Sequence, residues 1–180
     1  MCSNIESTIY QVSMNIKTKR LIITEFNESM IESVYLNSQD EDNKRFVPDE
    51  VYESIDEAKE VVHYLINQYN SQDGPFVYPI LLHDETNIGY VQLVHIDEGW
   101  EIGYHIAKQF TKLGYATEAV KAILPFAMEK LNINQIYGIC LEENVASYKV
   151  LEKAGFTLEY KGLSTYLGNK RLIQKYKYSI

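Results

Sequence analysis

The chain has 180 residues, of which 46% are hydrophobic and 23% charged, so it can bury one core and is too apolar to be disordered on composition. Its formal net charge of −8 argues against a broad nucleic-acid-binding face, because such a face needs clustered Lys and Arg. The same charge suits a cationic partner, although it is equally typical of a surface that is merely soluble.

Cysteine and histidine usage restricts the chemistry further. Cys2 and Cys140 lie far apart in the sequence, so we expect neither a disulfide framework nor a paired metal site. The four histidines form no short ligand pattern, and we predict no metal. No apolar stretch is long enough to cross a bilayer, and the first residues lack the order of a signal peptide. We therefore expect a cytoplasmic protein that binds neither nucleic acid nor membrane.

The first half of the chain predicts one strand followed by helices. Residues 19–26 are rich in β-branched side chains and predict a strand. Asn27 is a candidate cap for the helix that follows it, and residues 40–48 are typical of either a loop or a short helix. Ser54 and Glu57 form a capping box before a second apolar helical pattern. Residues 1–13 are expected to be a flexible N-terminal extension, and residues 14–180 are expected to form a single domain.

The second half predicts most of a sheet. We expect a hairpin of strands at 75–83 and 87–96, followed by a third strand at 100–106. A helix at 116–131, a strand at 134–141 and a helix at 144–155 come next, and two long strands occupy 156–180. Strands and helices therefore alternate without repeats or linkers. This order predicts one α/β domain with a mixed sheet.

The segment QFTKLGYATEAV, residues 109–120, joins a predicted strand to a predicted helix through small residues. The first turn of a helix leaves backbone N–H groups without partners, and the helix dipole adds partial positive charge there. Gly114 and Ala116 let an anion approach these groups, while Thr111 and Thr117 add hydroxyl donors. The segment is neither G-x-x-x-x-G-K-[ST] nor G-x-G-x-x-G. Taken alone, it is equally typical of a phosphate site and of an ordinary helix start.

Further motifs flank this segment in a fixed order. TKRLIIT stands at 18–24 and EIGYHI at 101–106, while 111–119 reads TKLGYATEA. Residues 144–156 read NVASYKVLEKAGF and fit the pattern N-x-x-S-x-x-V-x-E-K-x-G-F at every specified position. Together these motifs resemble the GNAT acetyltransferases, most closely their RimJ/RimL-like branch, whose cofactor loop reads roughly [QR]-x-x-G-x-[GA]. The resemblance extends from Lys17 to the C-terminus.

This resemblance implies a fold and a cofactor. The fold is a single GNAT-like domain with a central mixed, mostly antiparallel sheet that is splayed at the cofactor site, and with about four helices. The cofactor is acetyl-CoA. The residues that the resemblance places against it come from a strand end, the loop, the first helical turn and a later helix start: Ile106, Thr111, Lys112, Leu113, Gly114, Tyr115, Ala116, Thr117 and Asn144. Thr111 stands where the family has Gln or Arg, and Lys112 where it has a small residue.

The resemblance also implies direct attack of a primary amine on the acetyl group. An alkylamine is mostly protonated at neutral pH, so a base or a water chain must remove a proton. Glu101 is the candidate base or water-holder, with an ordinary surface carboxylate or a partner for the substrate's charge as the alternatives. Many family members use a tyrosine as the donor to the departing thiolate at a position that is Leu151 here, which makes Ser147 the candidate donor. Alternatively, Ser147 and Asn144 only begin and cap a helix.

The function implied is that of an acetyl-CoA-dependent N-acetyltransferase. Its acceptor is expected to be a cationic amine, either a protein N-terminus or a small molecule. A catalytically silent acyl-CoA-binding or regulatory domain is the alternative, because the usual tyrosine is missing and the loop departs from the family pattern. Family members are often homodimers, but nothing in the sequence specifies an interface.

Overall fold

The computed structural model describes residues 14–166 and 168–180, so the expected extension 1–13 lies outside the described residues. Within this part the strands form one eight-stranded sheet in the order β1-β2-β3-β4-β5-β6-β8-β7. The strands are β1 (Asn15–Lys17), β2 (Leu21–Thr24), β3 (Phe76–Leu82), β4 (Asn87–Ile96), β5 (Gly99–Ile106), β6 (Gln135–Leu141), β7 (Thr157–Tyr166) and β8 (Asn169–Ser179). Only β5 and β6 pair in parallel among the described strands, which confirms the predicted mixed, mostly antiparallel sheet.

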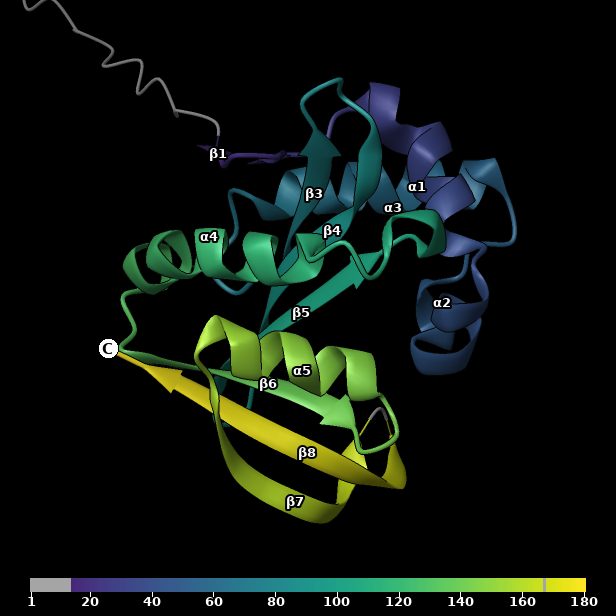
Figure 1. Cartoon of the computed structure of the whole chain (residues 1–180). Helices are drawn as coiled ribbons and strands as arrows, with labels where there is room; N and C mark the ends of the chain where they lie inside the picture. Colours follow the sequence, from purple (N-terminus) through teal and green to yellow (C-terminus); the bar gives the residue numbers. More distant parts are fainter. Residues whose placement is uncertain (1–13, 167) are drawn as a thin grey trace, which may run out of the picture.

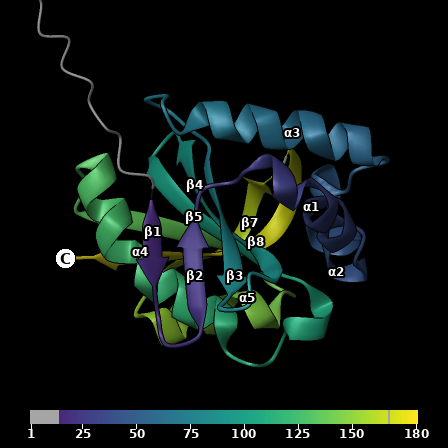
Figure 2. The same cartoon turned by 90° about the horizontal axis from the view of Figure 1, so that it is seen from above.

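Helices cover both faces of the sheet (Figures 1 and 2). The α-helices are α1 (Ile31–Ser38), α2 (Glu41–Phe46), α3 (Ile55–Gln68), α4 (Tyr115–Leu131) and α5 (Val145–Ala154). The described residues also form three short 3₁₀ turns, each followed in chain order by an α-helix: η1 (Glu28–Met30), η2 (Pro48–Glu50) and η3 (Lys108–Phe110). Helices α1 and α3 pack on one face, whereas α4 and α5 pack side by side on the other.

Local capping explains where the early helices begin. The Asn27 side chain accepts a hydrogen bond from the Ser29 N–H and starts η1. Asp40 accepts from the Asn43 N–H, so the stretch that was typical of either a loop or a helix begins helix α2. Ser54 accepts from the Glu57 N–H at 3.2 Å, which confirms half of the predicted capping box. The caps therefore determine the residues at which η1, α2 and α3 begin.

The apolar core is unequal on the two faces. The larger cluster lies beneath α4 and α5, where fully buried residues such as Val120 and Ile123 pack against Ile102. The smaller cluster beneath α1 and α3 contains the buried residues Phe26, Val62, Leu65 and Val77. The thinner packing on the α1/α3 face leaves room for a pocket.

The sheet is splayed between β5 and β6. These strands share a single aligned pair, Glu101 with Tyr137, because β5 stays paired with β4 as far as Ile106 whereas β6 follows β8 along its whole length. Figure 1 shows the two strands diverging toward their C-terminal ends. Side chains alternate along a strand, so Glu101 and His105 face α1 and α3, whereas Tyr104 faces α5. Glu101 therefore lies at the vertex of the splay.

Candidate functional site

The N-terminus of α4 carries no side-chain cap. Gly114 is the N-cap residue in the left-handed conformation, with φ 83°, and it has no side chain that could cap the helix. The first backbone bond of the helix runs from the Glu118 N–H to the Gly114 carbonyl at 3.1 Å. The N–H groups of residues 115–117 therefore have no intrahelical acceptor, and the helix dipole makes their surroundings attractive to an anion. This arrangement fits the diphosphate of a coenzyme.

The loop before α4 is exposed and uses part of its polarity locally. Lys112 is exposed and has φ 64°, a left-handed conformation that is uncommon for a lysine. The Thr111 hydroxyl donates to the Lys108 carbonyl at 2.9 Å. Both residues lie beside the first turn of α4, as the sequence predicted. Their contact with a cofactor stays a prediction.

Arg20 holds this loop against β2, and sequence reasoning missed its role. Its guanidinium donates to the Leu113 carbonyl at 2.9 Å and lies 4.5 Å from the centre of the Tyr115 ring. It also pairs with Glu118 of α4 at 2.6 Å. The Thr18 hydroxyl donates to the same carboxylate at 2.6 Å. In the sequence, residues 18–20 (TKR) and 117–119 (TEA) both belong to the family motifs. That does not reveal that Thr18 and Arg20 bind Glu118.

Glu101 is a half-buried carboxyl at the vertex of the splay. Burial raises its pKa to about 7, although a hydrogen bond from the Ile139 backbone N–H opposes this shift. A carboxyl with that pKa is substantially ionised at neutral pH and still basic enough to accept a proton. The predicted base thus lies where the strands separate, on the α1/α3 face.

On the opposite face, the start of α5 brings together a serine and a tyrosine. Asn144 caps the helix by accepting from the Ser147 N–H at 3.1 Å, so the local reading of Asn144 is confirmed. The Tyr104 hydroxyl donates to the Ser147 carbonyl at 2.7 Å and lies 3.1 Å from Ser147 Oγ. Leu151, at the position of the expected family tyrosine, is buried in the core. The phenol that lies beside Ser147 therefore belongs to Tyr104 of β5.

Comparison with known proteins identifies the family. Residues 20–157 match the family model described as the acetyltransferase (GNAT) domain, which is more than half of the chain. The chain belongs to the GNAT acetyltransferases. The uncharacterized N-acetyltransferase YnaD of Bacillus subtilis is 32% identical over 149 residues, covering 81% of this chain and 84% of the relative.

Solved GNAT structures share the fold. An acetyltransferase of the GNAT family from Bacillus anthracis superposes with a TM-score of 0.77 at 23% identity, covering 92% of this chain and 98% of the other. RimL, a ribosomal L7/L12 alpha-N-protein acetyltransferase solved in complex with coenzyme A, superposes with a TM-score of 0.77 at 21% identity, covering 93% and 98%. GNAT enzymes use acetyl-CoA, as the sequence motifs implied.

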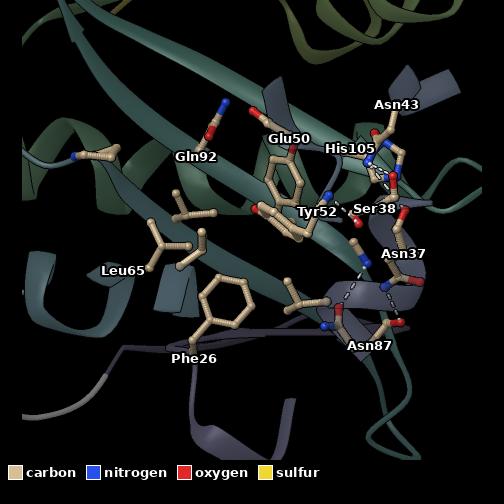
Figure 3. A pocket seen from close by; sticks show the side chains of 16 residues that line it. Phe26, Asn37, Ser38, Asn43, Glu50, Tyr52, Leu65, Asn87, Gln92 and His105 are labelled. Atoms are coloured by element: carbon tan, nitrogen blue, oxygen red, sulfur yellow. Dashed lines mark hydrogen bonds between the residues drawn. The ribbon is translucent and has the colours of Figure 1, made fainter. Parts of the chain in front are cut away.

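The α1/α3 face of this GNAT domain contains a pocket of about 160 Å³ beside the splay (Figure 3). Its lining comes from α1, α2, η2, α3, β3, β4 and β5. His105 forms part of the wall, and its Nε2 lies 3.2 Å from Asp40 Oδ2. Glu50 of η2 also lines the pocket, and burial raises its pKa to about 7. Sequence reasoning did not select Glu50, because nothing in a polar connection marks one carboxyl as buried.

Two further features of the described residues bear on the GNAT site. Across 14–166 and 168–180, no group of three or more His, Cys, Asp or Glu side chains is arranged to hold a metal ion. In the same ranges, no helix is long and apolar enough to cross a membrane.

Loss of the Arg20 contact is expected to weaken cofactor binding. Arg20→Ala removes the donor to the Leu113 carbonyl and the partner of Glu118, so the loop must be ordered at the expense of binding energy. We expect the Kd for coenzyme A to rise about tenfold, which corresponds to about 1.4 kcal/mol. Isothermal titration calorimetry measures this change. The exposed neighbour Lys19→Ala is the control, and equal affinity in the two variants would refute the anchoring role of Arg20.

Proposed function

We propose that this enzyme transfers an acetyl group from acetyl-CoA directly to a primary amine that enters from the α1/α3 face. The single observation that carries the proposal is the position of Glu101, a half-buried carboxyl at the vertex of the splay, on the face of the sheet that holds the pocket. A direct transfer needs a base between the acceptor and the thioester, and the position of Glu101 supports that role.

The residues of the loop and of the strand end fit the cofactor. The N–H groups of Tyr115, Ala116 and Thr117 in the uncapped first turn of α4 suit its diphosphate, and Gly114 allows close approach. The main chain of β5 near Ile106 has no β6 partner, so it is available to pair with the pantetheine amides. Acetyl-CoA supplies the acetyl group as an activated thioester.

Glu101 and Ser147 act on opposite faces of the sheet, Glu101 as a proton acceptor and Ser147 as a hydrogen-bond donor. Glu101 accepts a proton from the ammonium form of the acceptor, which leaves the free amine as the nucleophile. Ser147, held by the Tyr104 hydroxyl and by the Asn144 cap, donates a hydrogen bond toward the sulfur on the other face. Burial raises the pKa of Tyr104 well above its usual range, so its phenol stays neutral and able to donate.

Ser147→Ala is expected to lower kcat about tenfold with little change in the KM for acetyl-CoA. The hydroxyl is needed only as negative charge develops on sulfur, so its loss affects the transition state more than binding. Steady-state kinetics at saturating amine measures both constants. Val145→Ala, an exposed position on the same helix, serves as the control. A rise in KM without a fall in kcat would assign Ser147 to binding alone.

Release of free coenzyme A thiol in the presence of a panel of primary amines tests the proposed function itself. The expected result is amine-dependent thiol release above the hydrolysis background, together with the acetylated amine by mass spectrometry. A protein that binds coenzyme A but acetylates no amine would instead be the silent acyl-CoA-binding domain, for which the unusual Thr111 and Lys112 and the buried Leu151 are the supporting observations.

A further inference from the structure

The pocket on the α1/α3 face is amphipathic. Its floor is apolar and consists of Phe26, Val34, Val61, Leu65 and Val77. Its opposite wall, toward α2, η2 and the ends of β4 and β5, is polar. Figure 3 shows Glu50, Gln92, His105 and Asn43 grouped away from Phe26 and Leu65. An occupant that complements this pocket must therefore be polar at one end and apolar at the other.

The polar wall offers hydrogen-bond acceptors. Asn43 is 2% exposed, and its amide nitrogen donates to the carbonyls of Asn37 and Ser38. Its Oδ1 is buried and has no hydrogen-bond partner within the described residues. A buried oxygen without a partner costs about 1–3 kcal/mol, so a ligand that donates to it is favoured. Glu50 adds a carboxyl to the same wall.

Glu50 has a polar neighbour in the pocket wall. The Gln92 side chain lines the pocket with Glu50 and opposes the rise of the Glu50 pKa. It packs over Gly103, where an added Cβ would come 2.7 Å from Gln92 Nε2. Glycine at 103 thus makes space for Gln92, which lies in the pocket wall beside Glu50. The resulting wall is electronegative and specific for groups that donate hydrogen bonds.

This wall adjoins the catalytic vertex. Gln92, which lines the pocket with Glu50, is paired across β4 and β5 with Gly103, and Gly103 lies two residues from Glu101 on the same face of β5. An amine received at Glu50 is accordingly close to Glu101. Its substituent then points to the apolar floor.

We infer that the acceptor is a primary amine carrying one compact apolar substituent, received through its N–H groups by Glu50 and Asn43. The inference rests on the proposed function and names its acceptor class. A cavity of about 160 Å³ matches the size of an apolar site that holds a benzene ring, which is about 150 Å³. A polyamine fits poorly, because its second ammonium would be buried against the apolar floor at a high desolvation cost. Glu50 is a specificity residue in this scheme, and Glu101 remains the base.

The test compares amines of similar reactivity at one pH. For 2-phenylethylamine and isopentylamine we expect kcat/KM at least tenfold above that for ethanolamine or spermidine, through a lower KM. Equal or higher kcat/KM for the polar amines would overturn the inference while leaving the proposed function intact. Binding of 2-phenylethylamine to the protein saturated with coenzyme A is measured by calorimetry in parallel. Binding without turnover would count against the proposed function, and absence of binding would overturn the inference.

Paired variants distinguish the two halves of the pocket. Glu50→Gln is expected to raise the KM for 2-phenylethylamine about tenfold, whereas Asp49→Asn, an exposed neighbour in η2, is expected to leave it unchanged. Val61→Phe fills the floor and is expected to raise that KM at least tenfold. Ile66→Phe on the same helix is half-buried but does not line the pocket, so it controls for stability. Unchanged KM values in both pocket variants would refute the assignment.

Discussion

Glu101→Gln is expected to lower kcat about 100-fold or more at pH 7.5, because an amide cannot accept the proton that the ammonium must lose. Stability is expected to be equal to or higher than that of the wild type at pH 8. Burial raises the pKa of Glu101 to about 7, so the folded state disfavours its carboxylate and loses stability as the pH rises from the unfolded pKa toward 7. The neutral amide avoids that penalty. Steady-state kinetics and thermal unfolding at pH 8 measure the two effects.

The pH profile of the wild type is the companion measurement. Below pH 7 the carboxyls of Glu101 and Glu50, whose pKa values burial raises to about 7, are both increasingly protonated, so kcat/KM should fall at least tenfold per pH unit. A carboxyl with an ordinary pKa would give no such fall between pH 5.5 and 7. Glu60→Gln, an exposed carboxylate on α3, is the control and should keep both rate and profile. An active Glu101→Gln enzyme would show that another group or a water chain accepts the proton.

Gly114→Val is expected to raise the Kd for coenzyme A about 100-fold. A side chain at the N-cap of α4 obstructs the N–H groups of the first turn, and a β-branched residue is strained at φ 83°. The chain offers a matched control in Gly168, which has φ 74° in the β7–β8 turn and open space where a Cβ would lie. Valine at either position strains the backbone by a similar amount, so the Tm of both variants should fall by a similar few degrees. Only Gly114→Val should lose coenzyme affinity, and calorimetry compares the two.

Much of the fold is predictable because its signals are local. Asn27 and Ser54 cap their helices through hydrogen bonds to residues two or three positions away, which a sequence pattern captures. Alternation along β5 likewise places Glu101 and Tyr104 on opposite faces. The expected splay follows from the family motifs, and the structure explains it by the different partners of β5 and β6.

The contacts that complete the site are not local, and the sequence could not specify them. Arg20 and Glu118 are 98 positions apart, and a strand pattern does not say which helix end will lie over it. Tyr104 meets Ser147 only because α5 packs on the same face of β5. Glu50 lies in a connection whose burial depends on α2 and α3 together. These residues are visible only after the packing is known.

We propose that the uncapped first turn of α4 holds the diphosphate of coenzyme A. Calorimetric titration with coenzyme A and with pantetheine, which lacks the diphosphate, measures what this turn contributes to binding. We expect coenzyme A to bind at least 100-fold more tightly, because only it presents an anion to the N–H groups of Tyr115, Ala116 and Thr117. Equal affinities for the two compounds would contradict the account.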